Sequence, residues 1–305
     1  MRVVVGAAGR ADKLLVESLG GSSRRLVAQA FAEGRVRLNG RRARKGDAVV
    51  AGDVLELEGD AARGALAPVP EPDRPLTVVF EDEHLVAVSK PAGIPSCPLR
   101  AGERGTLANA LAARFPEAVA AGADPREAGL AHRLDAGTSG LLLAARRAEV
   151  WQALRAAFRA GAVKKEYLAL VEGAVDERLV VDAPIAHDRS GVGGVRAGDV
   201  PGALRALTEI LPQKRLGRYS LVRCITRSGR MHQVRVHLAL VGHPCVGDVR
   251  YGAPSTDLVS DGAFLHAESL ELAHPVTKRA LALHAPWPPE RARLVGSLTQ
   301  GQVST

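Results

Sequence analysis

The hydrophobic pattern near the start of the chain indicates two short helices. The first is expected over residues 11–19, because apolar positions recur there at helical spacing, and Gly20-Gly21 interrupts it. Ser22 or Ser23 can cap a second helix that runs to about Glu33, after which Gly34 stands where a C-terminal cap is expected. The apolar faces consist of Leu14, Leu15 and Leu19 in the first helix and of Leu26, Ala30 and Phe31 in the second.

The pattern then changes to alternation, which is typical of strands. Val36 and Leu38 alternate with arginines, and Asn39-Gly40 favours a two-residue hairpin turn. A further strand is expected over residues 54–57, after Gly52-Asp53. One apolar face can therefore close on itself while the arginines point outward, which predicts a small folded domain over residues 1–59.

A change in composition separates this block from the rest of the chain. Residues 60–75 are expected to form an extended linker, because proline lacks a backbone donor and four prolines fall within eight positions: Pro68, Pro70, Pro72 and Pro75. Apolar runs then predict strands over 76–80 and 84–88, a helix over 106–115 and a buried strand over 141–144. We expect a larger domain over residues 76–292 and a tail over 293–305.

Composition narrows the class of protein. Of 305 residues, 46% are hydrophobic and 24% charged, which is typical of a globular protein. No apolar stretch approaches the roughly 20 residues that cross a bilayer, and charge appears by Arg10, too early for a signal peptide. The expectation is a soluble, cytoplasmic protein, by default a monomer, with no membrane partner.

Neither a metal nor a cofactor is expected. The three cysteines contain no C-x-x-C pair, and the nine histidines lack zinc-site spacing. The chain also lacks a phosphate-binding P-loop and a nucleophile elbow. The cysteines are best interpreted as buried thiols in a reducing compartment.

Positive charge is concentrated in the N-terminal block. The whole chain carries +8, and residues 24–45 alone hold eight basic residues against the single acid Glu33. Such clustering favours a polyanionic partner. Since aromatic residues are scarce and only Phe31 lies in this block, we expect recognition of the backbone and shape of structured RNA rather than stacking on single strands.

One segment contains a candidate catalytic carboxylate, and its sequence is Gly129-Leu-Ala-His-Arg-Leu-Asp-Ala-Gly-Thr-Ser-Gly-Leu-Leu-Leu-Ala-Ala145. It places Asp135 on a loop between apolar segments, close to Gly137 and Gly140. On spacing alone, an Asx turn that satisfies the local backbone is the simpler interpretation.

Two resemblances change this interpretation. The first block resembles the S4 RNA-binding domain over about residues 10–59, notably in Ser23-Arg-Arg-Leu-Val and Gly34-Arg-Val-Arg-Leu-Asn-Gly. The larger block resembles the RluA-type pseudouridine synthases, on His132-Arg-Leu-Asp135 with Thr138-Ser-Gly-Leu141. Further matches follow in the family's order: Lys90-Pro-Ala-Gly93, Lys164-Lys-Glu-Tyr167, Gly229-Arg-Met-His-Gln-Val-Arg235, Gly247-Asp248-Val-Arg-Tyr251-Gly252, Leu265-His-Ala267 and His274-Pro275.

The resemblance implies an α+β fold, with a mixed or antiparallel sheet in the catalytic domain and a small α/β S4-like N-terminal domain. It also implies isomerisation of uridine to pseudouridine in RNA without a cofactor, with Asp135, Tyr167 and Arg235 as catalytic residues. Asp135 would act on the sugar and Arg235 would pair with it, unless Arg235 is one more RNA-facing arginine on an alternating strand. Tyr167 would stack on the target base. The RNA- and substrate-binding candidates are Arg133, His132, Thr138, Arg230, His232, Gln233, Arg24, Arg25, Arg41 and Arg42.

Some features and alternatives stay open at this point. Met231 replaces a hydroxyl residue of the family pattern, and the Gly-rich stretch 190–202 is expected to be a variable loop. A non-catalytic RNA-binding or ribosome-assembly factor could keep the same fold, and transfer RNA could replace the favoured large-subunit ribosomal RNA. A glycosidase-like hydrolase would need a second acid, and Asp248 lies in what looks like a turn.

Overall fold

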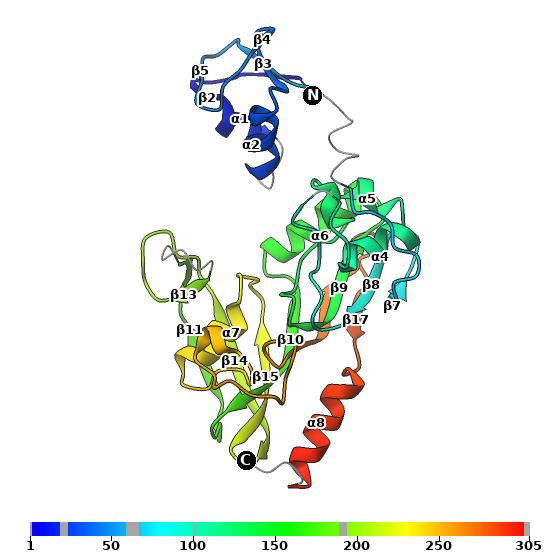
Figure 1. Cartoon of the computed structure of the whole chain (residues 1–305), viewed down its shortest axis with the longest axis vertical. Helices are drawn as coiled ribbons and strands as arrows, with labels where there is room; N and C mark the ends of the chain where they lie inside the picture. The colour runs from blue at the N-terminus through cyan, green and yellow to red at the C-terminus, as the bar shows by residue number, and fades with distance from the viewer. Residues whose placement is uncertain (1, 19–23, 59–66, 101, 189–193, 302–305) are drawn as a thin grey trace.

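The computed structural model of the chain describes residues 2–18, 24–58, 67–100, 102–188 and 194–301, with residues 24–26 as backbone only. Its N-terminal elements and its remaining elements form separate sheets (Figure 1). None of the helices in these ranges is long and apolar enough to cross a membrane.

The N-terminal block packs two helices, α1 (Ala11–Ser18) and α2 (Arg24–Ala32), with a four-stranded sheet. The strand order is β1 (Arg2–Val4), β6 (Val54–Leu57), β3 (Val36–Leu38) and β4 (Arg41–Arg42). A second ladder joins β2 (Gly9–Arg10) to β5 (Ala48–Val49). The two helices, strands β3 and β6 and the turn after β3 were expected, and the core of this block contains Leu15, Ala30, Phe31, Val36, Leu38 and Leu55.

The predicted turn chemistry of this block is confirmed where the structure describes it. Asn39 and Gly40 have φ of 49° and 82°, as a type I′ hairpin requires, and Leu38 pairs with Arg41 across the turn. Gly34 follows α2 with φ of 72°, the left-handed conformation of a C-cap. The expected helix break at Gly20-Gly21 and the cap at Ser22 or Ser23 lie outside the described residues.

The larger block is built on a nine-stranded sheet. Its main path runs β11 (Leu179–Asp182), β14 (Leu207–Leu216), β15 (Tyr219–Thr226), β10 (Lys164–Glu172), β16 (Leu265–Ala273), β9 (Ser139–Ala145), β8 (Leu85–Lys90) and β7 (Thr77–Glu81). β17 (Ala280–His284) pairs with β16, and β12 (Ile185–His187) pairs with β13 (Val195–Ala197) in a separate hairpin. The sheet is mixed, because β16 and β9 are parallel while the other pairs are antiparallel.

Strand β9 is covered on both faces, which explains its continuous apolar sequence. Leu142 and Ala144 pack with helix α4 (Leu107–Arg114), whereas Leu141 and Leu143 pack with helix α6 (Ala148–Arg159). All seven residues of β9 are buried. A short helix α5 (Ala118–Ala121) and the 3-10 turn η1 (Pro125–Glu127) complete the layers around this half of the sheet.

The other half of the sheet is covered by helix α7 (Gln233–Leu240), whose Val234 and Leu238 join the core of β10, β14 and β15. The alternative interpretation, in which Arg235 lies on an alternating strand, is therefore wrong. Gln233, Val234, His237 and Leu238 are buried together, at the i, i+1, i+4 and i+5 spacing of a helix face. The alternation of valines with Arg235 and His237 is too short to distinguish the two-residue period of a strand from the 3.6-residue period of a helix.

Three segments differ in detail from what the sequence predicted. Residues 293–299, expected as tail, form the second part of helix α8 (Pro289–Thr299), whose Leu294, Val295 and Leu298 pack against Leu170 and Phe264. In the expected linker, the Asn109 side chain of α4 donates to the Val69 carbonyl, which holds this part of the segment against the helix. Within the expected loop 190–202, residues 195–197 form β13, and 189–193 lie outside the described residues.

Candidate active site

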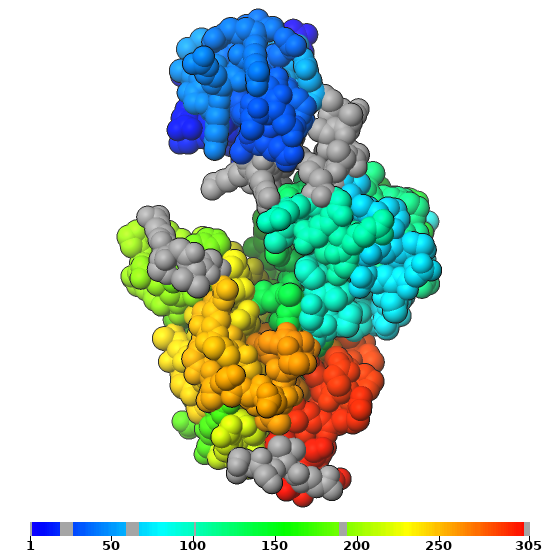
Figure 2. Space-filling model, in the orientation of Figure 1, coloured from blue at the N-terminus to red at the C-terminus, as the bar shows by residue number. Residues whose placement is uncertain are grey.

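A cavity of about 1070 Å³ lies where the two halves of the large sheet meet. Its wall is formed by the loop before β9, by β10 and by the segment 225–235 that leads into α7. Figure 2 shows the molecule hollowed between the cyan half and the yellow and orange half. The cavity is lined by both acidic and basic groups, among them Asp135, Arg133, Arg155, Lys165 and Arg235.

The loop that carries Asp135 is fixed through its backbone carbonyls. The Leu134 carbonyl accepts from Ser96 Oγ at 2.8 Å, and the Asp135 carbonyl accepts from the Thr138 amide at 3.1 Å. The Ala136 carbonyl accepts from the Gly93 amide and from Lys90 Nζ, both at 2.9 Å. The Gly137 carbonyl accepts from Arg291 Nη2 of α8, also at 2.9 Å. Four consecutive carbonyls are thus held by donors from β8, its following loop, the turn itself and the C-terminal helix.

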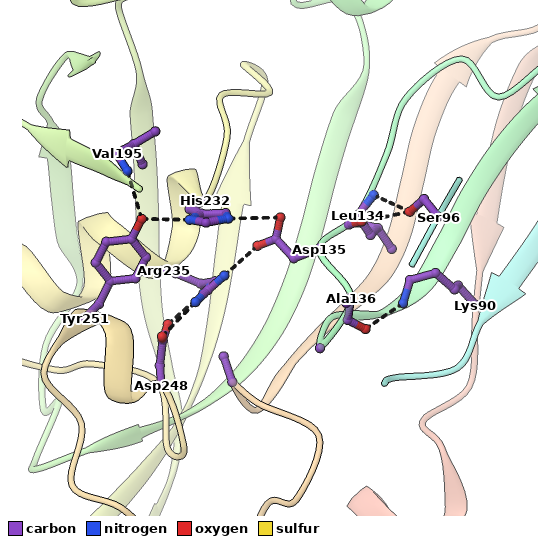
Figure 3. Close-up of polar contacts among 12 residues, drawn as sticks. Lys90, Ser96, Leu134, Asp135, Ala136, Val195, His232, Arg235, Asp248 and Tyr251 are labelled. Carbon is purple, nitrogen blue, oxygen red and sulfur yellow. Dashed lines mark hydrogen bonds and ion pairs between the residues drawn. The ribbon is translucent and has the colours of Figure 1, made fainter. Parts of the chain in front are cut away.

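Lys90 is fully buried and donates to the carbonyls of Pro91, Ile94 and Ala136 at 2.8–2.9 Å. These three acceptors match the three hydrogens of an ammonium group and favour its charged form. Burial, and next the charge of Arg291, lower the pKa of Lys90 to about 7. The resemblance to Lys90-Pro-Ala-Gly93 gave no role for this residue, and its contacts make it an anchor of the Asp135 loop (Figure 3).

Asp135 faces the guanidinium of Arg235, which comes from α7, 100 residues later in the chain. Arg235 Nη1 donates to Asp135 Oδ2 at 2.9 Å, and its Nε and Nη2 donate to the two oxygens of Asp248 at 2.7 Å each (Figure 3). The side chain of Asp248 is 1% exposed and that of Asp135 is 28% exposed. Asp248 therefore holds the arginine from inside the protein, while Asp135 keeps an open side toward the cavity.

The contacts with Asp248 and Asp135 stabilise the charged form of Arg235. Burial alone lowers the pKa of its guanidinium, but the hydrogen bonds and charges of Asp248, followed by those of Asp135, raise it above the ordinary value. A bidentate carboxylate also fixes the orientation of the planar fork. One nitrogen of Arg235 is thereby left directed at Asp135.

His232 approaches the second oxygen of Asp135. Its Nε2 lies 3.6 Å from Asp135 Oδ1, and its Nδ1 lies 2.7 Å from the hydroxyl oxygen of Tyr251. That hydroxyl also accepts the Val195 amide of β13 at 3.2 Å. His232 is a non-glycine residue in the left-handed conformation, with φ of 52°, just before α7 begins. Such backbone conformations carry strain and are held by their surroundings.

Tyr167 of β10 lines the same cavity and packs against the apolar cores on both sides of it. Burial, and next the negative charge of Asp135, raise the pKa of the Tyr167 phenol. The hydroxyl therefore keeps its proton at neutral pH. Its position suits stacking on a planar group, with the phenol as a hydrogen-bond donor rather than a ready base.

Some residues expected to bind substrate are used by the protein itself. His132 Nε2 accepts the Leu143 amide at 3.2 Å, and its ring lies 4.5 Å from that of Phe158. Burial, and next the charges of Lys165 and Arg155, lower the pKa of His132 to about 3, so it stays neutral. Thr138 is buried in the turn after Asp135. The contacts of His132 and Thr138 brace the loop that presents Asp135.

Gln233 is also engaged internally. Its amide nitrogen lies 2.8–3.2 Å from the Leu207 carbonyl and from the hydroxyls of Thr208 and Thr226, and its oxygen accepts from Ser228 Oγ and the Arg230 amide. These contacts occupy the hydrogen-bonding groups of the Gln233 side chain and fix the segment 228–233 beside the cavity. Arg230 in this segment donates from Nε to the Arg205 carbonyl and remains largely exposed, as does Met231.

Several basic side chains of the cavity come from outside the predicted set, among them Lys165 and Arg155. Lys165 of β10 donates to the Ser228 carbonyl and lies 5.8 Å from the Phe158 ring. Burial, and next the charge of Arg230, lower the pKa of Lys165 to about 8. Arg155 of α6 donates to the Ala131 carbonyl at 3.0 Å. By contrast, Arg133 is exposed at the cavity wall, as expected for a residue that meets RNA.

The N-terminal arginines do not share one environment. Arg35 pairs with Glu33 and Arg37 with Glu58, so these two are balanced within the block. Arg41 and Arg42 of β4 are exposed, with Arg41 3.9 Å from Asp47. Arg24 and Arg25 begin α2, and their side chains lie outside the description. Arg41 and Arg42 are thus available for an anionic partner.

Asp248 and Tyr251 support Arg235 and His232, and the sequence interpretation gave neither of them this role. Asp248 does lie in a turn, as expected, and is followed by the 3-10 turn η2 (Val249–Tyr251). The turn places its carboxylate inward against Arg235, which makes it unavailable as the second acid of a hydrolase. The matched segment Gly247-Asp248-Val-Arg-Tyr251-Gly252 was the available signal, but nothing in it indicates the distant partner. In the described ranges, no cluster of three or more His, Cys, Asp or Glu could hold a metal ion.

Comparison with known families agrees with this geometry. The family described as RNA pseudouridylate synthase matches residues 84–240, which contain Asp135, Tyr167 and Arg235. The S4 domain matches residues 9–55, the two-helix block with the exposed arginines of β4.

Individual relatives extend the similarity to most of the chain. Ribosomal large subunit pseudouridine synthase D of Xanthomonas campestris pv. campestris is 35% identical, over 96% of this chain and 90% of that protein. The protein of the same name from Nitrosomonas europaea is 37% identical over 73% of this chain and 65% of its own length. The solved structure of human RNA pseudouridylate synthase domain containing 1 is 26% identical, with a TM-score of 0.55 over 72% of this chain and 86% of that chain.

Proposed function

Because the chain belongs to the RNA pseudouridylate synthase family and is an RNA pseudouridine synthase, we propose that it modifies uridine in large-subunit ribosomal RNA and that Asp135 is the carboxylate that acts on the ribose. The reaction breaks the bond between ribose C1′ and uracil N1 and joins C5 to C1′. The hydrogen on C5 is lost as N1 gains one, so the exchange is an isomerisation within one nucleotide and needs no electron acceptor.

The observation that carries this proposal is the chain of contacts from Asp248 through Arg235 to Asp135. Cleavage of a glycosidic bond develops positive charge at the sugar, which a carboxylate beside C1′ or C2′ stabilises or traps. A buried, doubly held guanidinium keeps that carboxylate in one orientation. The exposed side of Asp135 then faces the cavity, where the ribose would lie.

The cavity also suits a nucleotide that has left its helix. A paired uridine is out of reach, so it must be turned out at a cost of a few kcal/mol. We infer that Tyr167 stacks on the extruded base, while Leu134 and Leu265 exclude water from it. Exposed Arg133, two residues before Asp135, would fill the vacated position or hold a flanking phosphate.

The choice of RNA rests on the relatives and on the N-terminal block. Two of the similar proteins are named as ribosomal large subunit enzymes, and the S4 match supports binding of structured RNA. We propose that residues 1–59 form the RNA-binding domain, that residues 60–75 connect it to the catalytic domain of residues 76–292, and that α8 completes the latter.

Comparison of the wild type with Asp135→Asn tests the proposal. Both proteins are incubated with large-subunit ribosomal RNA transcripts, and pseudouridine is located by carbodiimide treatment and primer extension. We expect modification by the wild type alone, because asparagine keeps the shape of the side chain but not its negative charge. Equal modification by the two proteins would remove Asp135 from this role.

The target is tested separately by mapping pseudouridine in RNA from a strain that lacks the gene. We expect sites to disappear from large-subunit ribosomal RNA and to return on complementation. Loss confined to transfer RNA would contradict the proposed target while leaving the reaction intact. Release of free uracil by the purified protein would instead indicate hydrolysis.

A further inference from the structure

The contact between Tyr251 and His232 points to a function for both residues that extends the proposed site. We propose that the Tyr251 hydroxyl fixes His232 in its neutral form with the proton on Nε2, and thereby directs an N–H group at Oδ1 of Asp135. Tyr251 is then a positioning residue that acts through His232. The inference rests on the proposed role of Asp135, and it concerns the oxygen that Arg235 does not contact.

The first argument comes from the donors and acceptors at Tyr251. A backbone amide can only donate, so the Val195 N–H, 3.2 Å away, uses the phenolic oxygen as an acceptor. The hydroxyl keeps one proton to donate, and His232 Nδ1 lies 2.7 Å from the same oxygen (Figure 3). Donation to Nδ1 requires a lone pair there, which leaves the ring proton on Nε2.

The second argument comes from the opposite side of the ring. His232 Nε2 lies 3.6 Å from Asp135 Oδ1, an electrostatic contact just beyond hydrogen-bond length. A lone pair on Nε2 would repel the carboxylate, whereas an N–H attracts it. Both ends of the imidazole therefore favour the same tautomer, although their partners come from separate segments of the chain.

The charges around His232 keep the ring neutral. Burial lowers the pKa of His232, and Arg235 of α7 and Arg250 of η2 lower it further, against the opposing carboxylates of Asp135 and Asp248. The β12–β13 hairpin contributes the Val195 amide to Tyr251, whose own ring meets that of His232 edge to face. A neutral donor stabilises the Asp135 oxygen without the tight ion pair that a protonated histidine would form.

The backbone supports a dedicated position for this side chain. His232 adopts the left-handed conformation at the N-cap of α7 without making a side-chain cap. Its conformation directs the ring away from the helix end and toward Tyr251 and Asp135 instead (Figure 3). The strained backbone at His232 therefore supports the position of its ring rather than a capping bond.

The tautomer can be measured directly in the full-length protein. Long-range ¹H–¹⁵N NMR of histidine-labelled wild type, with His232→Gln to assign the signals, reports which ring nitrogen carries the proton. We expect a protonated Nε2 and an unprotonated, hydrogen-bonded Nδ1 in the wild type. In Tyr251→Phe we expect the Nδ1 signal to lose this pattern and the pKa of His232 to rise, because the donor that stabilised the neutral ring is gone. A proton on Nδ1 in the wild type would overturn the proposal.

Activity gives the second readout. One lost hydrogen bond corresponds to a fall in kcat of between about twofold and about tenfold for Tyr251→Phe, with little change in KM for RNA. The acid limb of its pH–kcat profile should move to higher pH, since His232 gains a proton sooner. Tyr219→Phe makes the same change at a buried tyrosine of β15 outside the cavity, and its profile should match the wild type. An unshifted acid limb in Tyr251→Phe would contradict the proposal.

His232→Gln provides a variant that keeps an N–H near the Nε2 position but has no tautomers. In that background, Tyr251→Phe should have little further effect on kcat, because there is no ring proton left to place. Additive losses would show that Tyr251 acts independently of His232. A failure of the proposed role of Asp135 can be distinguished from a failure of this proposal. Full activity of Asp135→Asn would remove the role of Asp135, whereas the NMR measurement tests the tautomer of His232 independently of activity.

Discussion

At the scale of single residues, the position of Asp135 depends on groups from several distant segments. Arg235 contacts one carboxylate oxygen and His232 approaches the other, while Lys90 and Arg291 hold the carbonyls of Ala136 and Gly137. Side chains from β8, α7 and α8 therefore fix the position of Asp135 together. The residues next to Asp135 in the sequence form the turn, but the positive charge that faces it belongs to Arg235, 100 residues later in the chain.

Asp248 is the residue whose replacement isolates the orientation of Arg235. In Asp248→Asn the guanidinium loses a buried anion and one arm of its bidentate contact, so it is free to rotate away from Asp135. We expect kcat to fall at least about tenfold with a smaller change in RNA affinity, because the buried arginine is left partly unpaired. The protein should also lose on the order of 3 kcal/mol of unfolding free energy.

Single-turnover kinetics and urea unfolding of Asp248→Asn measure these two effects. Asp176→Asn, at an exposed carboxylate of the same domain, is the matched control and should behave like the wild type. Wild-type turnover by Asp248→Asn would show that Arg235 needs no second anion to hold its position.

At the scale of elements, the site depends on the junction between β9 and β16. These strands are parallel neighbours with Ser139 opposite His266 and Gly140 opposite Ala267. Gly140 has φ of 114°, and a Cβ atom there would lie 2.1 Å from the Ala267 carbonyl oxygen. The junction joins the half of the sheet that carries Asp135 to the half that carries Tyr167, and both residues line the cavity.

Gly140→Ala should therefore be severely destabilising. The backbone conformation alone costs about 1–3 kcal/mol for a residue with a side chain, and the collision with a backbone oxygen adds to it. The control is Gly242→Ala, because Gly242 has a similar positive φ of 84° but open space around its Cβ direction. We expect thermal unfolding to show a clearly larger drop in Tm for Gly140→Ala. Equal drops would mean that the close contact with β16 contributes nothing.

At the scale of the whole molecule, the exposed arginines of β4 lie in a different block from the catalytic chemistry, although the cavity has basic side chains of its own. The exposed arginines of β4 belong to the N-terminal sheet, whereas Asp135 lies in the cavity of the nine-stranded sheet. Substitutions at β4 should therefore change the affinity for RNA and leave the chemical step unchanged.

Combined Arg41→Gln and Arg42→Gln substitutions test this separation. Each lost phosphate contact should flatten the log–log dependence of RNA affinity on salt by about 0.7–0.9 units, since fewer counterions are released on binding. Single-turnover rates at saturating enzyme should stay near the wild-type value. A salt titration of RNA binding measures the slope, with Arg279→Gln, an exposed arginine of the catalytic block, as the matched control. An unchanged slope would count against phosphate contacts at β4.

The sequence by itself determined those features that depend on neighbouring residues. The turn at Asn39-Gly40, the cap after α2, helix α4 and the buried strand β9 follow from local spacing, because their stabilising contacts lie within a few positions. The motif resemblance identified Asp135, Tyr167 and Arg235 as candidates. It could not assign α7, since Val-Arg-Val-His fits a strand as well as a helix buried on one face.

Only the tertiary structure decided which of these side chains face one another. In the sequence Asp248 is a turn residue, and only the fold brings it against Arg235. The contacts of His132 and Gln233 with the backbone and with neighbouring side chains are likewise visible only in the folded chain. The physical reason is distance along the chain. Local spacing fixes the direction of a side chain within its element, but charge pairing and hydrogen bonding depend on segments up to about a hundred residues apart, which meet only when the sheet has closed.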